Sequence, residues 1–124
     1  MAYRIRQLEA GIIVLAFSGP VPIRERFDAK ESLEAALRER QDNPSVLVDL
    51  TDAQVQLYGA ADALKLSEMV YRTRPRFSKL AYLVRPDQLD MVAAVVGGLY
   101  GSSVLQRFTA RQSALDWLRK PGTT

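Results

Sequence analysis

The chain has 124 residues, of which 48% are hydrophobic and 25% are charged, and its formal net charge is +3. This length and mix predict one globular domain that needs no covalent cross-link. The chain contains neither cysteine nor histidine, which excludes disulfides, thiolate chemistry and the most common general base and metal ligand in proteins. The positive charge is too small to indicate nucleic acid as a partner.

The first twenty residues predict a β-hairpin. Residues 3–8 mix apolar and charged side chains, as edge strands do, and residues 12–17 are continuously apolar, as in a strand covered on both faces. Residues 9–11 (EAG) fit a tight turn between them. Residues 18–20 (SGP) are expected to end the second strand.

Helices and strands then alternate along the chain. The first predicted helix begins at Pro22, follows the apolar positions Ile23, Phe27, Leu33 and Leu37, and stops before residues 42–44 (DNP). Further strands are predicted over residues 46–50, 80–84 and 104–108. Further helices are predicted over residues 60–73 and from Pro86 to about residue 100. A final helix is predicted after a capping box formed by Thr109 and Gln112.

This alternation predicts parallel strand pairing through crossover helices. We therefore expect an α/β fold with a single mixed, mostly parallel sheet of about five strands and about four helices. The domain should cover residues 1–120, and residues 121–124 should form a frayed tail. The amino terminus lacks a signal peptide, and the longest uncharged run is too short and too broken to span a bilayer, so we expect a cytoplasmic protein.

The helix predicted from Pro86 is apolar nearly all round. One stripe of apolar side chains supplies a core face of this helix. A second set of apolar residues lies off that stripe: Met91, Val95 and Leu99. A helix of this kind must be covered on both sides. Either neighbouring elements of the same chain bury the second set, or it contacts an apolar small molecule or lipid, a protein partner, a membrane surface or a second copy of the chain.

Two loops are expected at the carboxyl ends of strands, where α/β sheets usually build their sites. One loop closes at Tyr58 and Gly59 before the second helix, and the other holds Pro86 and Asp87 before the third. The free N–H groups that begin a helix can hold an anion or a carboxylate. The simpler alternative is that Gly59 only permits the turn and that Tyr58 packs on the surface.

Asp49 and Asp52 lie at the predicted end of the third strand. Two carboxylates can bind Mg²⁺ or share a proton, but an aspartate at a strand end commonly caps a turn through its own backbone. The absence of a third ligand or a phosphate-binding loop favours the cap.

A basic segment follows the second predicted helix, with Arg72, Arg74 and Arg76 close to the aromatic residues Tyr71 and Phe77. These arginines can contact an anion or a lipid headgroup. Alternatively, they are cations that suit the carboxyl end of a helix in a solvated connection.

Three stretches carry a family resemblance: residues 46–52 (VLVDLTD), residues 76–84 (RFSKLAYLV), and residues 107–109 with 114–118 (RFT and ALDWL). In order and spacing they resemble the STAS domain, the fold of anti-sigma-factor antagonists. The chain is similar above all to the bacterial STAS-like group of small proteins related to CRAL-TRIO lipid-binding domains. The resemblance implies a regulatory or lipid-binding domain without enzymatic activity.

One motif departs from that family. A regulatory STAS domain carries a phosphorylatable serine in an Asp-Ser-Ser-Gly turn before its second helix. Residues 56–59 (QLYG) occupy that position here, so the glycine is kept and the serine is absent. The resemblance therefore implies that a phosphoserine switch does not operate in this chain, which moves the interpretation towards a ligand-binding or scaffolding variant.

Together these features predict a non-catalytic binding or regulatory domain that needs no cofactor or metal. Its ligand or partner site is expected at the second and third predicted helices, over Tyr58, Gly59, Pro86, Asp87, Met91, Val95 and Leu99, with anion contacts from Arg72, Arg74 and Arg76. A homodimer through the third helix is one form of this hypothesis. The alternatives are an antagonist-type protein–protein module without the serine, and a metal-dependent enzyme that uses Asp49 and Asp52.

Overall fold

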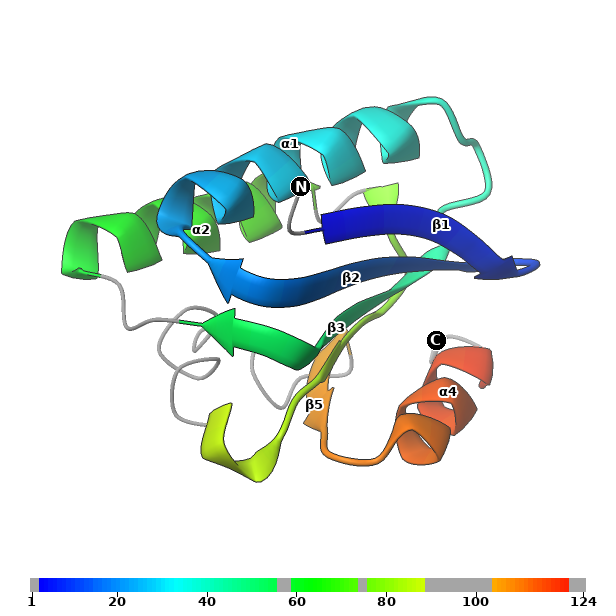
Figure 1. Ribbon diagram of the computed structural model, residues 1–124. Coiled ribbons are helices and arrows are strands. Elements are labelled where there is room, and N and C mark those ends of the chain that lie inside the picture. Colours follow the sequence, from blue (N-terminus) through cyan, green and yellow to red (C-terminus); the bar gives the residue numbers. More distant parts are fainter. Residues whose placement is uncertain (1–2, 56–58, 74–75, 89–103, 121–124) are drawn as a thin grey trace.

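The computed structural model describes residues 3–55, 59–73, 76–88 and 104–120 (Figure 1). In chain order these residues form β1 (Tyr3–Glu9), β2 (Ile12–Val21), α1 (Ile23–Arg38), β3 (Ser45–Val55), α2 (Ala60–Thr73), β4 (Leu80–Leu83), the 3₁₀ helix η2 (Pro86–Gln88), β5 (Leu105–Phe108) and α4 (Arg111–Arg119). The predicted order of elements is confirmed for this part of the chain. Most of the helix predicted from Pro86, and the tail over residues 121–124, lie outside the described residues.

The five strands form one sheet in the order β1-β2-β3-β4-β5. β1 pairs with β2 in antiparallel fashion, and the remaining neighbours are parallel. The helices α1 and α2 lie on one face of the sheet and α4 lies on the other (Figure 1). The expected mixed, mostly parallel α/β sheet is therefore confirmed. Three α-helices are described, where the sequence predicts about four.

The two faces of the sheet carry two hydrophobic cores. Side chains alternate along β2, so Ile13, Leu15 and Phe17 enter the core beneath α1 and α2, whereas Ile12 and Val14 enter the core beneath α4. All five are at most 4% exposed. Coverage on both faces is the physical reason for the continuous apolar run in this strand.

The central strands are longer than the sequence predicts. β2 does not end at residues 18–20, because Ser18 to Val21 pair in parallel with Asp52 to Val55 of β3. Gly19 takes a φ of +68° just beyond a break in the register, a conformation that glycine adopts without steric cost. β3 likewise runs to Val55 rather than to Leu50, so each strand supplies backbone partners that prolong the other.

The helix α1 buries a row of charged residues that the apolar pattern alone does not reveal. Arg26, Lys30 and Glu34 are spaced four residues apart and are at most 7% exposed. Lys30 donates from Nζ to the hydroxyl of Tyr82 at 3.0 Å, and the Arg26 guanidinium lies 5.5 Å from the Phe17 ring centre. Long aliphatic stems allow such side chains to cover apolar surface while their charged ends reach partners.

The capping box predicted for α4 is wrong. Ala110 is the residue that precedes the helix, and no side chain caps it; Gln112 instead donates to Asp116 at 2.8 Å. The carboxyl end of α4 is held by Lys79, whose Nζ donates to the carbonyls of Trp117 at 2.7 Å and Lys120 at 3.1 Å. These hydrogen bonds from an ammonium group suit the negative end of the helix dipole, although burial and the charge of Lys120 lower the pKa of Lys79.

Two leucines on α2 differ in burial, which predicts different losses of stability when each is replaced by alanine. Leu66 is fully buried, whereas Leu64 is 62% exposed. We expect Leu66→Ala to reduce the free energy of unfolding by about 2–5 kcal/mol, because it removes buried methyl groups and leaves a cavity. Leu64→Ala is the matched control and should change it by less than about 0.5 kcal/mol. Urea unfolding followed by circular dichroism measures both, and equal losses would contradict the described packing of α2.

Candidate functional site

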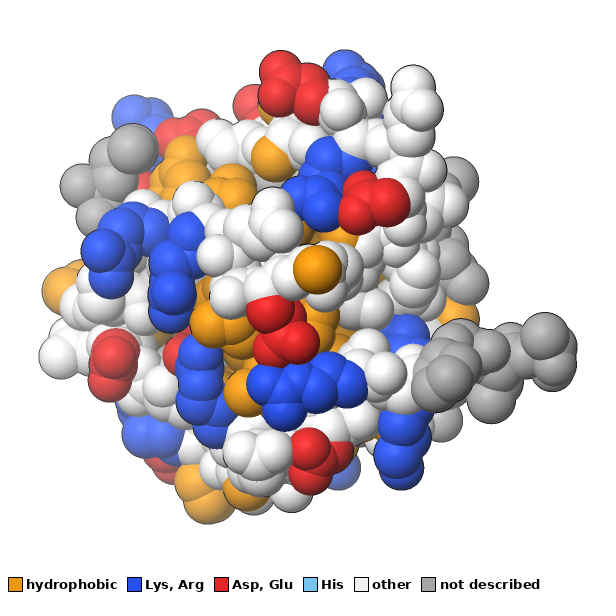
Figure 2. All heavy atoms as spheres, turned by 90° about the vertical axis from the view of Figure 1, so that its right-hand side faces the viewer, with side chains coloured by type: hydrophobic (Ala, Val, Ile, Leu, Met, Phe, Trp, Pro, Cys, Tyr) orange, Lys and Arg blue, Asp and Glu red, His pale blue; other side chains and the backbone are white. Residues whose placement is uncertain are grey.

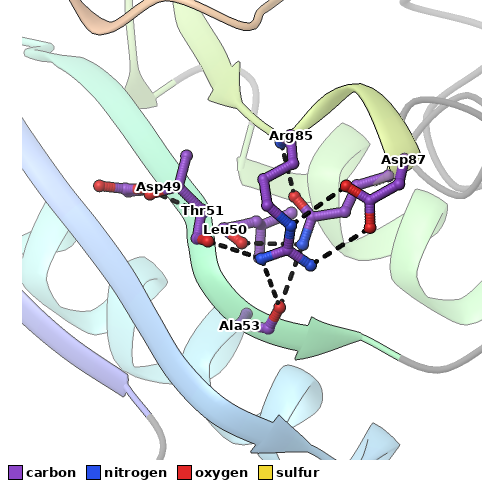
Figure 3. A network of polar contacts seen from close by, with 7 residues as sticks. Asp49, Leu50, Thr51, Ala53, Arg85 and Asp87 are labelled. Carbon is purple, nitrogen blue, oxygen red and sulfur yellow. Dashed lines mark hydrogen bonds and ion pairs between the residues drawn. The ribbon is translucent and has the colours of Figure 1, made fainter.

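The carboxyl half of β3 runs beyond its parallel neighbour. β4 pairs with β3 only from Val46 to Asp49, so the β3 carbonyls that follow need other donors. Arg85 Nη1 donates to the carbonyl of Thr51 at 2.6 Å and to that of Ala53 at 3.1 Å. Figure 3 shows Arg85 pointing from the end of β4 toward this segment of β3.

Gln88 completes the attachment of this turn to β3. Its side chain is 1% exposed, and its Nε2 donates to the carbonyls of Leu50 at 2.9 Å and Ala53 at 3.1 Å. Its Oε1 accepts from the Arg85 backbone N–H at 2.8 Å. Every polar atom of the amide is therefore used, which fixes η2 against the strand.

The Arg85 guanidinium also binds a carboxylate. Its Nε donates to Asp87 Oδ1 at 3.1 Å, and this hydrogen bond is the main reason that the pKa of Asp87 lies below its usual value. Asp87 and Pro86 are exposed. The structure thus places both predicted residues beside β3, at the end of the sheet where site loops are expected.

The helix α2, which Gly59 immediately precedes in the sequence, starts at the same end of the sheet (Figure 1). A Cβ on Gly59 would meet no atom within 4 Å, and its φ lies outside the left-handed region. Gly59 itself therefore has a backbone conformation and surroundings that a larger residue could also take, while the preceding residues 56–58 lie outside the described residues. Ala60 and Ala61 are exposed, and Asp62 lies in the first helical turn, where a carboxylate suits the helix dipole.

Leu64 is the feature of this region that the sequence analysis did not identify. Among the described residues it is the large hydrophobic side chain that is exposed. The signal was present in the sequence, because the apolar spacing predicts an inward stripe of Ala63, Leu66 and Val70 that leaves Leu64 out. We use the name carboxyl edge for two parts of the structure that lie at the carboxyl ends of the parallel strands: the start of α2, with Gly59, Ala60, Ala61 and Leu64, and the η2 turn.

Among the residues that the structure describes, Asp49 and Asp52 have no third acidic side chain placed with them to hold a metal ion. Asp49 Oδ1 accepts from the Thr51 backbone N–H at 2.9 Å and from its hydroxyl at 2.6 Å, and Asp49 Oδ2 accepts from Arg111 at 3.3 Å. These bonds agree with the capping interpretation, although Asp49 and Asp52 lie within β3 rather than at its end. In the described ranges, no group of three or more acidic side chains could hold a metal ion.

The arginines of the basic segment have different surroundings in the structure. Arg72 and Arg38 bind the two oxygens of Glu34, at 2.9 Å and 2.7 Å, beside a groove of about 330 Å³ between α1 and α2. Arg76 is exposed, and Arg74 lies outside the described residues. Headgroup or anion contact by these arginines stays a prediction, as does contact by Tyr58, Met91, Val95 and Leu99, which also lie outside the described residues.

The opposite end of the sheet, where the parallel strands begin, carries exposed ion pairs. Figure 2 shows this end, with charged side chains of both signs and apolar side chains between them. Arg119 binds Glu9 at 2.7 Å, and Arg40 binds Asp42 at 2.7 Å. The hydrogen bonds from these arginines hold the pKa values of both carboxyls below their usual range. In the part of the chain that is described, no helix is long and apolar enough to cross a membrane.

Comparison with known proteins identifies the fold. No protein-family model matches the chain, and no curated protein matches it. One similar solved structure is an uncharacterised protein of the DUF3478 family with a SpoIIAA-like fold from Shewanella loihica PV-4, at 21% identity and a TM-score of 0.61 over 94% of this chain and 92% of that chain. Another is an anti-sigma factor antagonist from Mycobacterium paratuberculosis, at 15% identity and a TM-score of 0.63 over 95% of this chain and 93% of that chain. The chain has the STAS-like fold that the sequence resemblance implied.

The attachment of η2 to β3 can be tested by an isosteric change. Gln88→Glu removes the amide donor and places a carboxylate against two carbonyls, which should reduce the free energy of unfolding at pH 7 by about 1–3 kcal/mol. Burial raises the pKa of such a carboxyl, so the loss should shrink as the pH falls and the new side chain binds a proton. Gln54→Glu, at an exposed position on β3, is the control. An equal effect of the two variants in urea unfolding would show that the Gln88 bonds do not hold η2.

The ion pairs of Glu34 predict a pH-dependent contribution to stability. Burial opposes ionisation of Glu34, but the hydrogen bonds and charges of Arg72 and Arg38 outweigh it, and its pKa is lowered. The stabilisation is therefore present at neutral pH and lost as the pH falls through this lowered pKa. We expect Glu34→Gln to cost about 1 kcal/mol at pH 7, since solvent screens both arginines, and less at acidic pH. Thermal unfolding of the variant and the original protein between pH 7 and pH 3 measures this loss of stability, and Glu31→Gln, at an exposed position, is the control. A loss that is the same at every pH would contradict the role given to the Glu34 ion pairs.

Proposed function

We propose that this chain is a non-catalytic, cytoplasmic protein-interaction domain of a regulatory system, and that it binds its partner through the carboxyl edge. The observation that carries this proposal is the exposure of Leu64. Its side chain is 62% exposed, whereas the other large hydrophobic side chains that the structure describes are buried or partly buried. Exposed apolar side chains of this size commonly supply the contact energy of protein interfaces.

The surroundings of Leu64 support a protein partner. Ala60 and Ala61 are small and exposed, so a partner can approach the helix backbone closely. The η2 turn, at the same end of the sheet, presents the exposed carboxylate of Asp87 on a backbone that Gln88 holds against β3. A surface that is already ordered costs less entropy to bind. The likeness to a protein described as an anti-sigma factor antagonist favours the same interpretation.

The chemistry of the described residues favours binding over catalysis. The chain has no histidine or cysteine, and the Asp49 carboxylate is engaged by Thr51 and Arg111. Residues 56–59 lack the serine of a regulatory STAS domain. We therefore propose that the partner is recognised without a phosphoserine switch. Contact of Met91, Val95 and Leu99 with a lipid or a second copy remains a separate proposal.

Site-specific photo-crosslinking tests the proposed surface. A benzophenone amino acid at Ala61 should trap one defined protein in cells that naturally express the chain, and Leu64→Asp in the same protein should abolish the product. The same group at Gln41, an exposed position between α1 and β3, is the control and should trap nothing specific.

Two results would contradict this function. A crosslinked protein that survives Leu64→Asp would place the interface elsewhere. A lipid carried through purification, detected by native mass spectrometry in place of any trapped protein, would favour the ligand-binding interpretation instead.

A further inference from the structure

The outer edge of β1 is a second surface, separate from the carboxyl edge. β1 is the first strand of the sheet and pairs only with β2 among the described strands. Its other side therefore presents backbone N–H and C=O groups that no described strand uses (Figure 1). Such an edge is able to accept one more strand.

Side-chain contacts hold β1 in place along its length. The Tyr3 hydroxyl lies 2.9 Å from the Ser32 hydroxyl on α1, Gln7 accepts from Arg40 at 3.1 Å, and Glu9 is paired with Arg119. A strand fixed at both ends and in the middle loses little conformational entropy when it binds a partner.

The two faces of β1 differ in character. Tyr3 and Ile5 pack partly buried against the core beneath α1 and α2, so their neighbours Arg4 and Arg6 point to the other face. Both arginines are exposed. No ion pair joins either of them to a described residue, whereas Arg38, Arg40, Arg72, Arg85, Arg111 and Arg119 all bind carboxylates.

We propose that the outer edge of β1 binds an extended segment of another protein in which acidic and apolar residues alternate. The backbone of that segment would continue the sheet, its acidic side chains would meet Arg4 and Arg6, and its apolar side chains would extend the contact of Tyr3 and Ile5. Opposite charges on neighbouring strands stabilise a sheet. A second copy of β1 fits less well, because an antiparallel copy centred on Arg6 places two guanidinium groups opposite each other.

A synthetic peptide tests this proposal without a known partner. The probe is a fluorescein-labelled peptide of sequence EVEVEVE, and binding is followed by fluorescence anisotropy and by amide shifts in NMR spectra. We expect saturable binding with the largest shifts in residues 3–9. A peptide with lysine in place of glutamate, and one with two central prolines that cannot pair as a strand, should each bind roughly tenfold or more weakly.

Charge reversal on the protein completes the test. Arg4→Glu with Arg6→Glu should weaken the acidic peptide roughly tenfold or more and strengthen the lysine peptide. Arg24→Glu with Lys65→Glu changes the net charge equally at two exposed positions and should leave both affinities unchanged. Absence of saturable binding, equal losses in the two double variants, or shifts outside β1 would overturn the proposal and would indicate that the arginines only protect the edge from aggregation. None of these results depends on Leu64.

Discussion

The rest of the structure depends on how β3 is paired along its whole length. Over its first half, β3 is hydrogen-bonded between β2 and β4. Beyond Asp49 the pairing with β4 stops, and side chains take over: Arg85 and Gln88 bind the carbonyls of Leu50, Thr51 and Ala53. An unsatisfied buried carbonyl costs free energy comparable to a lost hydrogen bond. These contacts therefore allow the strand to extend, and the extension carries the chain to the start of α2.

The same contacts connect the fold to the proposed binding surface. Because η2 is held against β3, the loop after β4 and the helix after β3 are presented together at one end of the sheet. The opposite end is occupied by exposed ion pairs such as Glu9 with Arg119. The two ends differ in one respect: both carry exposed ion pairs, such as Arg85 with Asp87 at the carboxyl edge, but the carboxyl edge also presents the exposed Leu64 beside small residues.

Hydrophobic periodicity is sufficient to predict the order of the described elements, the hairpin and the bounds of α2. It fails where polar contacts decide the structure. The length of β3 depends on Arg85 and Gln88, which are distant in sequence from the carbonyls that they bind. The buried row on α1 depends on partners such as Tyr82, 52 residues away from Lys30. Polar residues between apolar positions are normally exposed, and only their spatial partners explain why these are buried.

The candidate site was likewise only partly predictable from the sequence. Pro86 and Asp87 are predicted at the edge of the sheet because loops after parallel strands meet there, and the structure places them as expected. Leu64 is missed because the apolar helix predicted from Pro86 carries the stronger hydrophobic signal, although the apolar spacing already places Leu64 off the predicted inward stripe of the second helix. Gly59 has a φ outside the left-handed region, and whether it serves an anion site or only the turn stays open between the two predicted roles.

Amide hydrogen exchange of the free protein tests the central claim most directly. The backbone N–H of Arg85 is bonded to Gln88 Oε1 at 2.8 Å, and the account predicts that it exchanges nearly as slowly as the amides of β4. Exchange at the rate of an exposed loop would contradict the claim, because η2 would then not be held against β3 and the carboxyl edge would not be preformed.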